Sequence, residues 1–325
     1  CSSDLFDIEG APEALNRAEE ELNVPVIFVT NNASRSVESV AEHLRELGVH
    51  TRAERVVSSA QAGAALLAQH VPADSKVLIT GTEALADCVR AVGLETVRKE
   101  EEGPVAVIQG FDPKIGWEDL AEAAYTLANP DILWIATNTD QSIPKERGQA
   151  PGNGTLVAAV ASATRRTPLV AGKPEAPIFH TAAKAVNSSR PVIVGDRLDT
   201  DILGANNAKM DGALVLTGVQ TYQDVIEAVP NQRPTYILRT LEDFFAPYPE
   251  IEVLYEGYEV TATGPTWQAR VRGENLSLTG PEIEDTEAFA GSESEAEAWR
   301  VACAAWWAAN PEQGARPNIQ GIPSA

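Results

Sequence analysis

The sequence predicts an α/β protein whose sheets are mostly parallel. Short apolar runs of strand length recur along the first two-thirds of the chain, and amphipathic helical stretches separate them. The run Val24–Thr30 is apolar at almost every position and rich in β-branched residues, as expected of a strand buried on both faces. Strands of this kind that alternate with helices are typical of parallel sheets.

The individual elements follow from the same patterns. Ala14–Leu22 has a helical pattern, and Ser36–Leu47 is an amphipathic helix that Gly48 ends. Further strands are expected at Lys76–Thr80, Val105–Ile108, Ile132–Ala136, Val192–Val194 and Ala213–Leu216. Further helices are expected at Trp117–Ala128, Thr155–Thr164 and Glu175–Ala185. Ligands of such sheets bind beyond the carboxyl ends of the strands, so polar residues directly after a strand are the site candidates.

From Ala246 onward the chain changes character, and acidic residues outnumber basic ones. Hairpin-like strands are expected within Glu252–Thr263 and Trp267–Arg272. A helix is expected after them, and it begins with a capping box over Ser294–Glu297. Four residues lie near one face of this helix: Trp299, Cys303, Trp306 and Trp307. We expect them to form part of the core or a docking surface rather than a ligand cage. This region is predicted to be a separate small α+β module.

Composition excludes several classes of function. A formal charge of −22 over 325 residues disfavours nucleic acid and a basic membrane-binding surface. The apolar runs are too short to span a membrane. The three cysteines lie far apart without a CxxC pair, which excludes a disulfide framework and a zinc site and suits the cytoplasm. The chain starts with Cys1 and its one methionine is Met210, so we expect that this start is not the native one.

Thr30-Asn31-Asn32 directly follows the first strand and is the first site candidate. A hydroxyl, side-chain amides and exposed backbone N–H groups can bind phosphoryl oxygens without adding charge. A capped turn that leads into the Ser36 helix is the alternative explanation, because Ser, Thr and Asn favour such positions. The second candidate is Lys173, within Gly172-Lys173-Pro174. It offers a compact positive charge for phosphate, and the alternative is a solvated surface lysine.

The third candidate is an acidic cluster after the strand that ends near Val194. Asp196 stands at the carboxyl end of this strand, where oxygen ligands suit Mg²⁺. Asp199 or Thr200 could instead cap a helix, with Asp201 as an acid in its first turn. Capping does not explain Asp196, a charge fixed at the end of an apolar strand. The cluster therefore predicts a magnesium site.

Together these motifs resemble the haloacid dehalogenase superfamily of phosphotransferases. The subclass it resembles has a large α/β cap between the second and third motifs, as in the 4-nitrophenylphosphatase and phosphoglycolate phosphatase group. The acidic C-terminal module is similar to that of actinobacterial glycerol-3-phosphate phosphatases, a region similar to an acetyltransferase fold. The stretches that carry the resemblance are Ile27–Arg35, Ile135–Asp140, Ala150–Gly154, Gly172–Pro174 and Gly195–Gly204.

The resemblance implies a Rossmann-like parallel core with an inserted α/β cap and a small C-terminal α+β module. It assigns residues 1–76 and 170–245 to the core, 77–169 to the cap and 246–325 to the module. The cap would close over the site and exclude water.

The resemblance also implies residue roles. Thr30 and the Asn31 backbone would bind the transferring phosphoryl group, and Asn32 would help to hold the substrate. Lys173 would neutralise phosphate and nucleophile charge. The metal would be Mg²⁺, with Asp196 as a direct ligand and Asp201 in support. Substrate choice would involve Asn138, Asp140 and Ile143.

Members of the superfamily begin with a strand that ends in Asp-x-Asp-Gly. The first aspartate attacks phosphorus, and the second acts as acid and base. Asp7-Ile8-Glu9-Gly10 superficially resembles this motif, but Gly10–Leu15 matches a helix start that lies well downstream of the nucleophile. We therefore expect the catalytic pair to be missing and the chain as written to be nearly inactive. A truncated or mis-started active enzyme is favoured over a dead relative.

The expected function is Mg²⁺-dependent hydrolysis of small phosphate monoesters, of the glycerol 3-phosphate or phosphoglycolate type, through an aspartyl-phosphate. The expected partner is a small phosphorylated metabolite, without nucleic acid or membrane, and a homodimer is compatible with the sequence. A non-catalytic phosphometabolite-binding or scaffold protein is the alternative. Acetyl transfer by the C-terminal module is disfavoured, because a glycine-rich pyrophosphate loop is not evident there.

Overall fold

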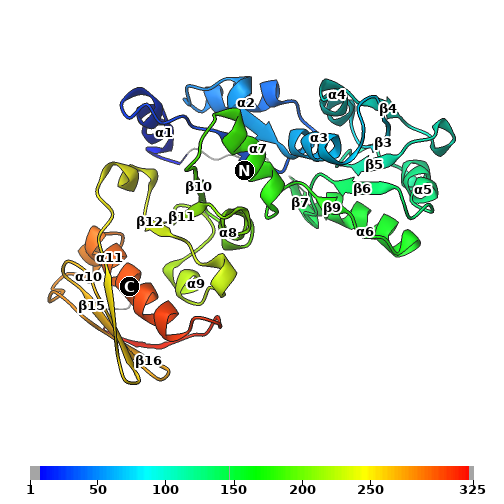
Figure 1. The fold of residues 1–325 in the computed structure, drawn as a ribbon. Coiled ribbons are helices and arrows are strands. Elements are labelled where there is room, and N and C mark those ends of the chain that lie inside the picture. Colours follow the sequence, from blue (N-terminus) through cyan, green and yellow to red (C-terminus); the bar gives the residue numbers. More distant parts are fainter. Residues whose placement is uncertain (1–7, 146, 322–325) are drawn as a thin grey trace. The chain divides into compact units, whose positions relative to one another are not determined.

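The computed structural model describes residues 8–145 and 147–321 and divides the chain into two compact units, Cys1–Arg190 and Pro191–Ala325. Both units combine parallel strands with helices (Figure 1). The prediction of an α/β fold built on parallel sheets is confirmed. Among the described residues, no helix has the length and apolar character that crossing a membrane requires.

The first unit begins with a small parallel pair of strands. β1 (Phe28–Thr30) pairs with β2 (Val56–Ser58), and Thr30 lies opposite Ser58. β1 is shorter than the expected strand from Val24, because Pro25 has no N–H to give to a ladder. The helices of this region are α1 (Ala11–Glu20), α2 (Val37–Glu46) and α3 (Ser59–His70), with a 3₁₀ turn at Ala53–Arg55.

A five-stranded parallel sheet follows, in the order β4-β3-β5-β6-β9. Its strands are β3 (Lys76–Thr80), β4 (Glu95–Val97), β5 (Ala106–Gln109), β6 (Leu133–Ala136) and β9 (Leu169–Val170). The connecting elements are α4 (Glu83–Ala91), a 3₁₀ turn at Glu100–Glu102, α5 (Trp117–Thr126), the hairpin β7 (Ser142–Lys145) and β8 (Gly148–Pro151), and α6 (Asn153–Thr164). The helix α7 (Ala176–Ala185) follows β9.

The two faces of this sheet are covered by different helices. Val107 and Trp134 pack in one buried cluster with Leu127, which follows α5, and with Val160 of α6. On the other face, Gly63 of α3 lies against Ile108 of β5. Because both faces are covered, the strand ends at Gln109 and Ala136 lead directly into buried loops.

The second unit contains a three-stranded parallel sheet in the order β10-β11-β12. Its strands are β10 (Val192–Gly195), β11 (Asp211–Val215) and β12 (Tyr236–Leu238). The remaining elements before the C-terminal region are a π-helical turn at Leu198–Ile202, α8 (Leu203–Ala208), α9 (Tyr222–Ile226), and 3₁₀ turns at Pro230–Gln232 and Leu241–Phe245.

The C-terminal region adds a five-stranded sheet packed on one long helix. Strands β13 (Glu252–Glu256) to β16 are antiparallel, and β17 (Asn318–Gln320) is parallel to β16. The other elements are β14 (Glu259–Thr263), β15 (Gln268–Arg272), β16 (Asn275–Thr279), α10 (Thr286–Phe289) and α11 (Glu293–Ala309). Leu214 and Ile237 share one hydrophobic core with Val301 and other residues of this region. Residues 246–321 are therefore packed as one body with the three-stranded sheet.

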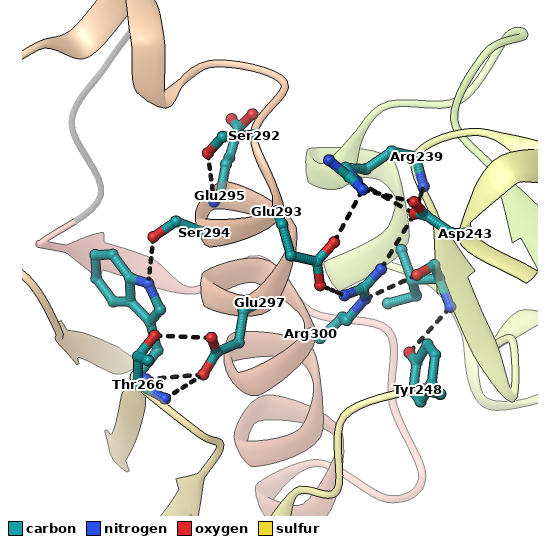
Figure 2. Close-up of polar contacts among 12 residues, drawn as sticks. Arg239, Asp243, Tyr248, Thr266, Ser292, Glu293, Ser294, Glu295, Glu297 and Arg300 are labelled. Carbon is teal, nitrogen blue, oxygen red and sulfur yellow. Dashed lines mark hydrogen bonds and ion pairs between the residues drawn. The ribbon is translucent and has the colours of Figure 1, made fainter. Parts of the chain in front are cut away.

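The start of α11 differs from the expected capping box. The Ser292 hydroxyl, and not Ser294, accepts a hydrogen bond from the N–H of Glu295 at 3.2 Å (Figure 2). Ser294 accepts from the indole of Trp267 at 3.0 Å, and the Glu297 carboxylate accepts from the N–H of Thr266 at 2.6 Å. Both serines have a glutamate three positions later, so the packing of Trp267 selects Ser292 as the cap.

The tryptophans of α11 lie in or against the core, as expected. Trp306 is buried, Trp299 stacks on Tyr222 with ring centroids 5.4 Å apart, and the Trp307 indole donates to the carbonyl of Ile226 at 3.2 Å. Their aromatic surface therefore stabilises the second unit rather than lining a ligand cage.

Candidate active site

The carboxyl end of β1 supplies a polar turn in the first unit. Thr30 is buried, and its hydroxyl accepts a hydrogen bond from the N–H of Asn32 at 3.1 Å. The Asn32 side-chain oxygen accepts from the N–H of Ser34 at 2.8 Å. Ser36, rather than Asn32, caps α2. These residues therefore form a hydrogen-bonded turn that leads into the helix capped by Ser36, as the alternative explanation expects.

Asn31 joins this turn to Lys173, which follows β9. The Lys173 N–H donates to Asn31 Oδ1 at 2.7 Å, and Asn31 Nδ2 donates to the Lys173 carbonyl at 3.0 Å. Lys173 is 8% exposed, so the alternative of a solvated surface lysine is wrong. The two residues lie more than a hundred positions apart in sequence, and the ends of two different strands bring them together.

The loop after β6 reaches the same place. Asn31 Nδ2 lies 3.3 Å from each carboxylate oxygen of Asp140, and Asn138 Nδ2 donates to the Asn31 carbonyl at 2.8 Å. Three strand ends therefore meet around the carboxamide of Asn31. Ile143 belongs to a different element, β7 of the hairpin, where it pairs with Ala150.

Two residues of this cluster were not singled out by the sequence. The Ser59 hydroxyl donates to the Asn31 carbonyl at 2.6 Å, and Asn153 Nδ2 donates to the Asn138 carbonyl at 2.7 Å. Asn153 lies within the Ala150–Gly154 stretch that carries part of the resemblance, which assigns it no role. Ser59 begins α3 and gives no signal of its own, because serine is common at helix starts.

The second unit holds the acidic cluster. Asp196 directly follows β10, and Asp201 is buried in the π-helical turn. A Cβ on Gly195 would lie 2.3 Å from Cγ of Asp201, so glycine is required for this close approach. Asp199 is exposed and forms a two-bond ion pair with Arg197, at 3.0 and 2.7 Å. The turn begins after Arg197 without a side-chain cap, so capping by Asp199 or Thr200 is wrong, whereas Asp201 is an acid of the first turn, as that alternative expects.

The chemistry of Asp196 and Asp201 suits Mg²⁺, which prefers oxygen ligands and usually keeps several waters. Within residues 8–145 and 147–321, no group of three or more His, Cys, Asp or Glu side chains is arranged to hold a metal. Two carboxylates would supply only part of an octahedral shell, and water would supply the rest.

The segment that superficially resembles the nucleophile motif lies at a helix start. Glu9 and Gly10 form a turn, and Gly10 precedes α1 with a φ of 78°. Asp7 lies outside the described residues. Among the described residues, Glu9 therefore lies in a turn that leads into α1 and not at the end of a described strand.

Comparison with known proteins defines the family. The model for haloacid dehalogenase-like hydrolases matches residues 6–95, and a second model of HAD-hydrolase-like proteins matches residues 170–244. A D-glycerol 3-phosphate phosphatase from Mycobacterium tuberculosis is 45% identical over 295 residues, covering 90% of this chain and 80% of the relative. An acid sugar phosphatase from Staphylococcus saprophyticus is 35% identical, covering 73% of this chain and 90% of the relative.

Solved structures agree with this comparison. A glycerol phosphate phosphatase from Mycobacterium tuberculosis in complex with magnesium has a TM-score of 0.80 and 37% identity, covering 100% of this chain and 90% of that one. A thermostable NPPase from Geobacillus stearothermophilus has a TM-score of 0.66 and 32% identity, covering 74% and 93%. The chain belongs to the haloacid dehalogenase-like hydrolases, with a Rossmann-like α/β fold, and by family it is a phosphatase.

Proposed function

We propose that the protein hydrolyses small phosphate monoesters of the glycerol 3-phosphate type with Mg²⁺. The observation that carries the proposal is the pairing of Asn31 with both backbone groups of Lys173, which fixes a buried lysine beside the Thr30–Asn32 turn. The substrate class is supported by the 45% identity to a D-glycerol 3-phosphate phosphatase. Phosphoglycolate, which shares a short chain and one phosphate, is the other substrate of this class.

In this proposal the first unit binds the phosphoryl group. The Thr30 hydroxyl and the Asn31 N–H would donate to phosphoryl oxygens, while the Lys173 ammonium group would neutralise their charge. A fixed cation is important in a protein with a formal charge of −22, because the surrounding field repels anions. Such preorganised charge stabilises the transition state of phosphoryl transfer.

Asp196 and Asp201 would hold Mg²⁺. When bound, the ion would supply positive charge to oxygen ligands. An aspartyl-phosphate would form in the reaction as the family resemblance implies, and we assign its nucleophile to none of the described residues.

We further propose that residues 77–169 form the cap and that residues 246–325 stabilise the second unit by packing against its parallel sheet. The five-stranded sheet lies almost entirely within the first of these ranges, and its hairpin β7–β8 directly follows the Asn138–Asp140 loop. The common core of Ile237 and Val301 supports the second role.

The test is phosphate release from glycerol 3-phosphate, phosphoglycolate and 4-nitrophenyl phosphate, with and without Mg²⁺. In a form of the protein that carries the nucleophilic aspartate, we expect the highest kcat/KM for glycerol 3-phosphate and loss of turnover in Asp196→Asn, which also reports contaminating phosphatases. Turnover that Asp196→Asn leaves unchanged would contradict the metal role. Turnover that depends on Asp7 or Glu9 would assign the nucleophile to the Asp7–Gly10 stretch. Substrate binding without phosphate release would favour the binding-protein alternative.

A further inference from the structure

We propose that the carboxamides of Asn31, Asn138 and Asn153 form a positioning relay that holds Lys173 in place and couples its loop to the start of α6. The inference rests on the proposed function, in which Lys173 binds the phosphate. It gives the side chain of Asn31 a role separate from that of its backbone N–H. It also gives Asn153 a role in a site that its side chain does not line.

The central member, Asn31, forms hydrogen bonds through both the oxygen and the amide group of its side chain. Its Oδ1 accepts from the Lys173 N–H at 2.7 Å, while its Nδ2 donates to the Lys173 carbonyl at 3.0 Å. The same Nδ2 group faces both oxygens of Asp140 at 3.3 Å. A side chain at this position must therefore both accept and donate. Aspartate would lose the donor, and an aliphatic residue would lose both functions.

The backbone of Asn31 is held in turn by Asn138. The Asn138 amide donates to the Asn31 carbonyl at 2.8 Å, where the Ser59 hydroxyl also donates at 2.6 Å. Asn138 Oδ1 accepts from the N–H of Asp140 at 3.2 Å. Asn138 is 4% exposed, so its amide has little access to competing water. It fixes the Thr30–Asn32 turn and the Asp140 loop at once.

The outer member, Asn153, anchors the relay at the first turn of α6. Its Nδ2 donates to the Asn138 carbonyl at 2.7 Å, and the residue is 1% exposed. A Cβ on the neighbouring Gly154 would lie 2.1 Å from the carbonyl oxygen of Thr139. Glycine therefore allows the helix start to approach the loop closely enough for Asn153 to reach it. This close approach explains why glycine follows asparagine in the Pro-Gly-Asn-Gly sequence at the start of α6.

Neutral amides suit this task because they add no charge near the proposed phosphate site. The charged residues that contact the Asn31 side chain are Asp140 and Lys173. In Asn31→Asp, two carboxylates would face each other across a short distance. Like charges raise the pKa of such a pair, and one shared proton would restore a donor at low pH. The relay therefore predicts a pH-dependent defect.

The experiment measures the affinity for inorganic phosphate between pH 5 and 8.5 by calorimetry. Asn31→Asp should weaken binding about tenfold at pH 8, the equivalent of one lost hydrogen bond in a buried network, and recover as the pH falls. The double variant Asn31→Asp/Asp140→Asn should regain most of the affinity at pH 8, because residue 140 then donates. Asn153→Ala, which changes no charge, should weaken binding about threefold.

A second readout needs no phosphate. Amide hydrogen exchange of the Lys173 N–H, which bonds to Asn31 Oδ1, should accelerate about tenfold in Asn153→Ala because the relay loosens. Asn16→Asp is the matched control. Asn16 donates to the carbonyl of Gly48 at 2.9 Å and accepts from the N–H of His50 at 2.7 Å, which is the same two-bond pattern outside the site. It should change neither readout.

The outcomes separate the relay from the function. An Asn153→Ala variant with native phosphate affinity and native Lys173 exchange would overturn the relay. A defect in Asn31→Asp that is equal at all pH values and is not relieved by Asp140→Asn would also overturn it, because neither a restored donor nor a restored net charge would then recover the affinity. Unchanged protein that binds no phosphate, while Asn153→Ala still accelerates Lys173 exchange, would overturn the proposed function and support the relay.

Discussion

A Cβ atom on Gly218 would lie 2.2 Å from Oδ2 of Asp196. The carboxylate of Asp196 therefore rests directly against the backbone of the loop between β11 and α9. This contact limits the positions that the carboxylate can adopt, and only a residue without a side chain leaves room for it. Gly218 is thus a part of the proposed metal site that carries no ligand atom.

The first prediction follows from this contact. Gly218→Ala should lower Mg²⁺ affinity at least tenfold, because Mg²⁺ tolerates little displacement of its oxygen ligands. Titration of the purified protein with Mg²⁺ provides the measurement, with Asp196→Asn for comparison. Gly116→Ala is the control, since a Cβ there would meet its nearest atom at 3.9 Å. Native Mg²⁺ affinity in Gly218→Ala would show that Asp196 does not need this loop.

The second prediction concerns the buried lysine of the first unit. Lys173→Met keeps the length of the side chain but removes its charge, and we expect the affinity for inorganic phosphate to fall about thirtyfold. Lys184→Met is the control, because Lys184 is an exposed lysine on α7. An equal and small effect of both variants would argue that general charge, rather than Lys173, attracts phosphate.

The third prediction concerns Arg300, which ties α11 to β12 (Figure 2). Its side chain is 2% exposed, donates to the Ile237 carbonyl at 2.9 Å and pairs with Glu293 and Asp243. The guanidinium also lies over the ring of Tyr248, 5.0 Å from the centroid. Arg300→Met leaves Asp243 buried with less compensation, so it should destabilise the second unit by about 3 kcal/mol.

Denaturant unfolding measures this loss. Arg270→Met removes the exposed pair between Arg270 and Glu259, and should cost no more than about 0.5 kcal/mol. A similar small cost for Arg300→Met would mean that the C-terminal region does not depend on this network for its packing.

The fourth prediction is a loss of stability at alkaline pH. Burial raises the pKa of the Cys303 thiol in the folded protein, whereas the thiol of the unfolded chain titrates at about 8.5. Above that pH the unfolded state releases a proton that the folded state keeps, so the free energy of unfolding falls as the pH rises. The slope is about 1.4 kcal/mol per pH unit for one such group. Burial also raises the pKa of Tyr248, which extends the effect above about pH 10.

Cys303→Ala tests this assignment through the slope rather than through the stability itself. The cavity that it creates lowers stability at every pH, but the decline between pH 9 and 10 should become shallower. An unchanged slope in Cys303→Ala would assign the alkaline decline to other groups.

The sequence by itself determined the strand ends at which we propose the site residues lie. Thr30 ends β1, Lys173 follows β9 and Asp196 follows β10, and each was predicted from a local apolar run that stops at a polar residue. The parallel α/β class was predicted in the same way, because strand and helix periodicities are local properties of the chain. Several short strands, among them β4 and β12, were missed because three residues give too little pattern.

Only the tertiary structure decided how these polar residues are used. Asn31, Asp140 and Lys173 are separated by long stretches of chain, and no periodicity shows that one carboxamide bonds to both of the others. Ser292 and Ser294 present the same capping pattern, yet the indole of Trp267 engages one of them and leaves the other to begin the helix. Hydrogen bonds between residues distant in sequence depend on where packing places their side chains. The local preferences of single residues, which a sequence shows directly, do not determine those positions.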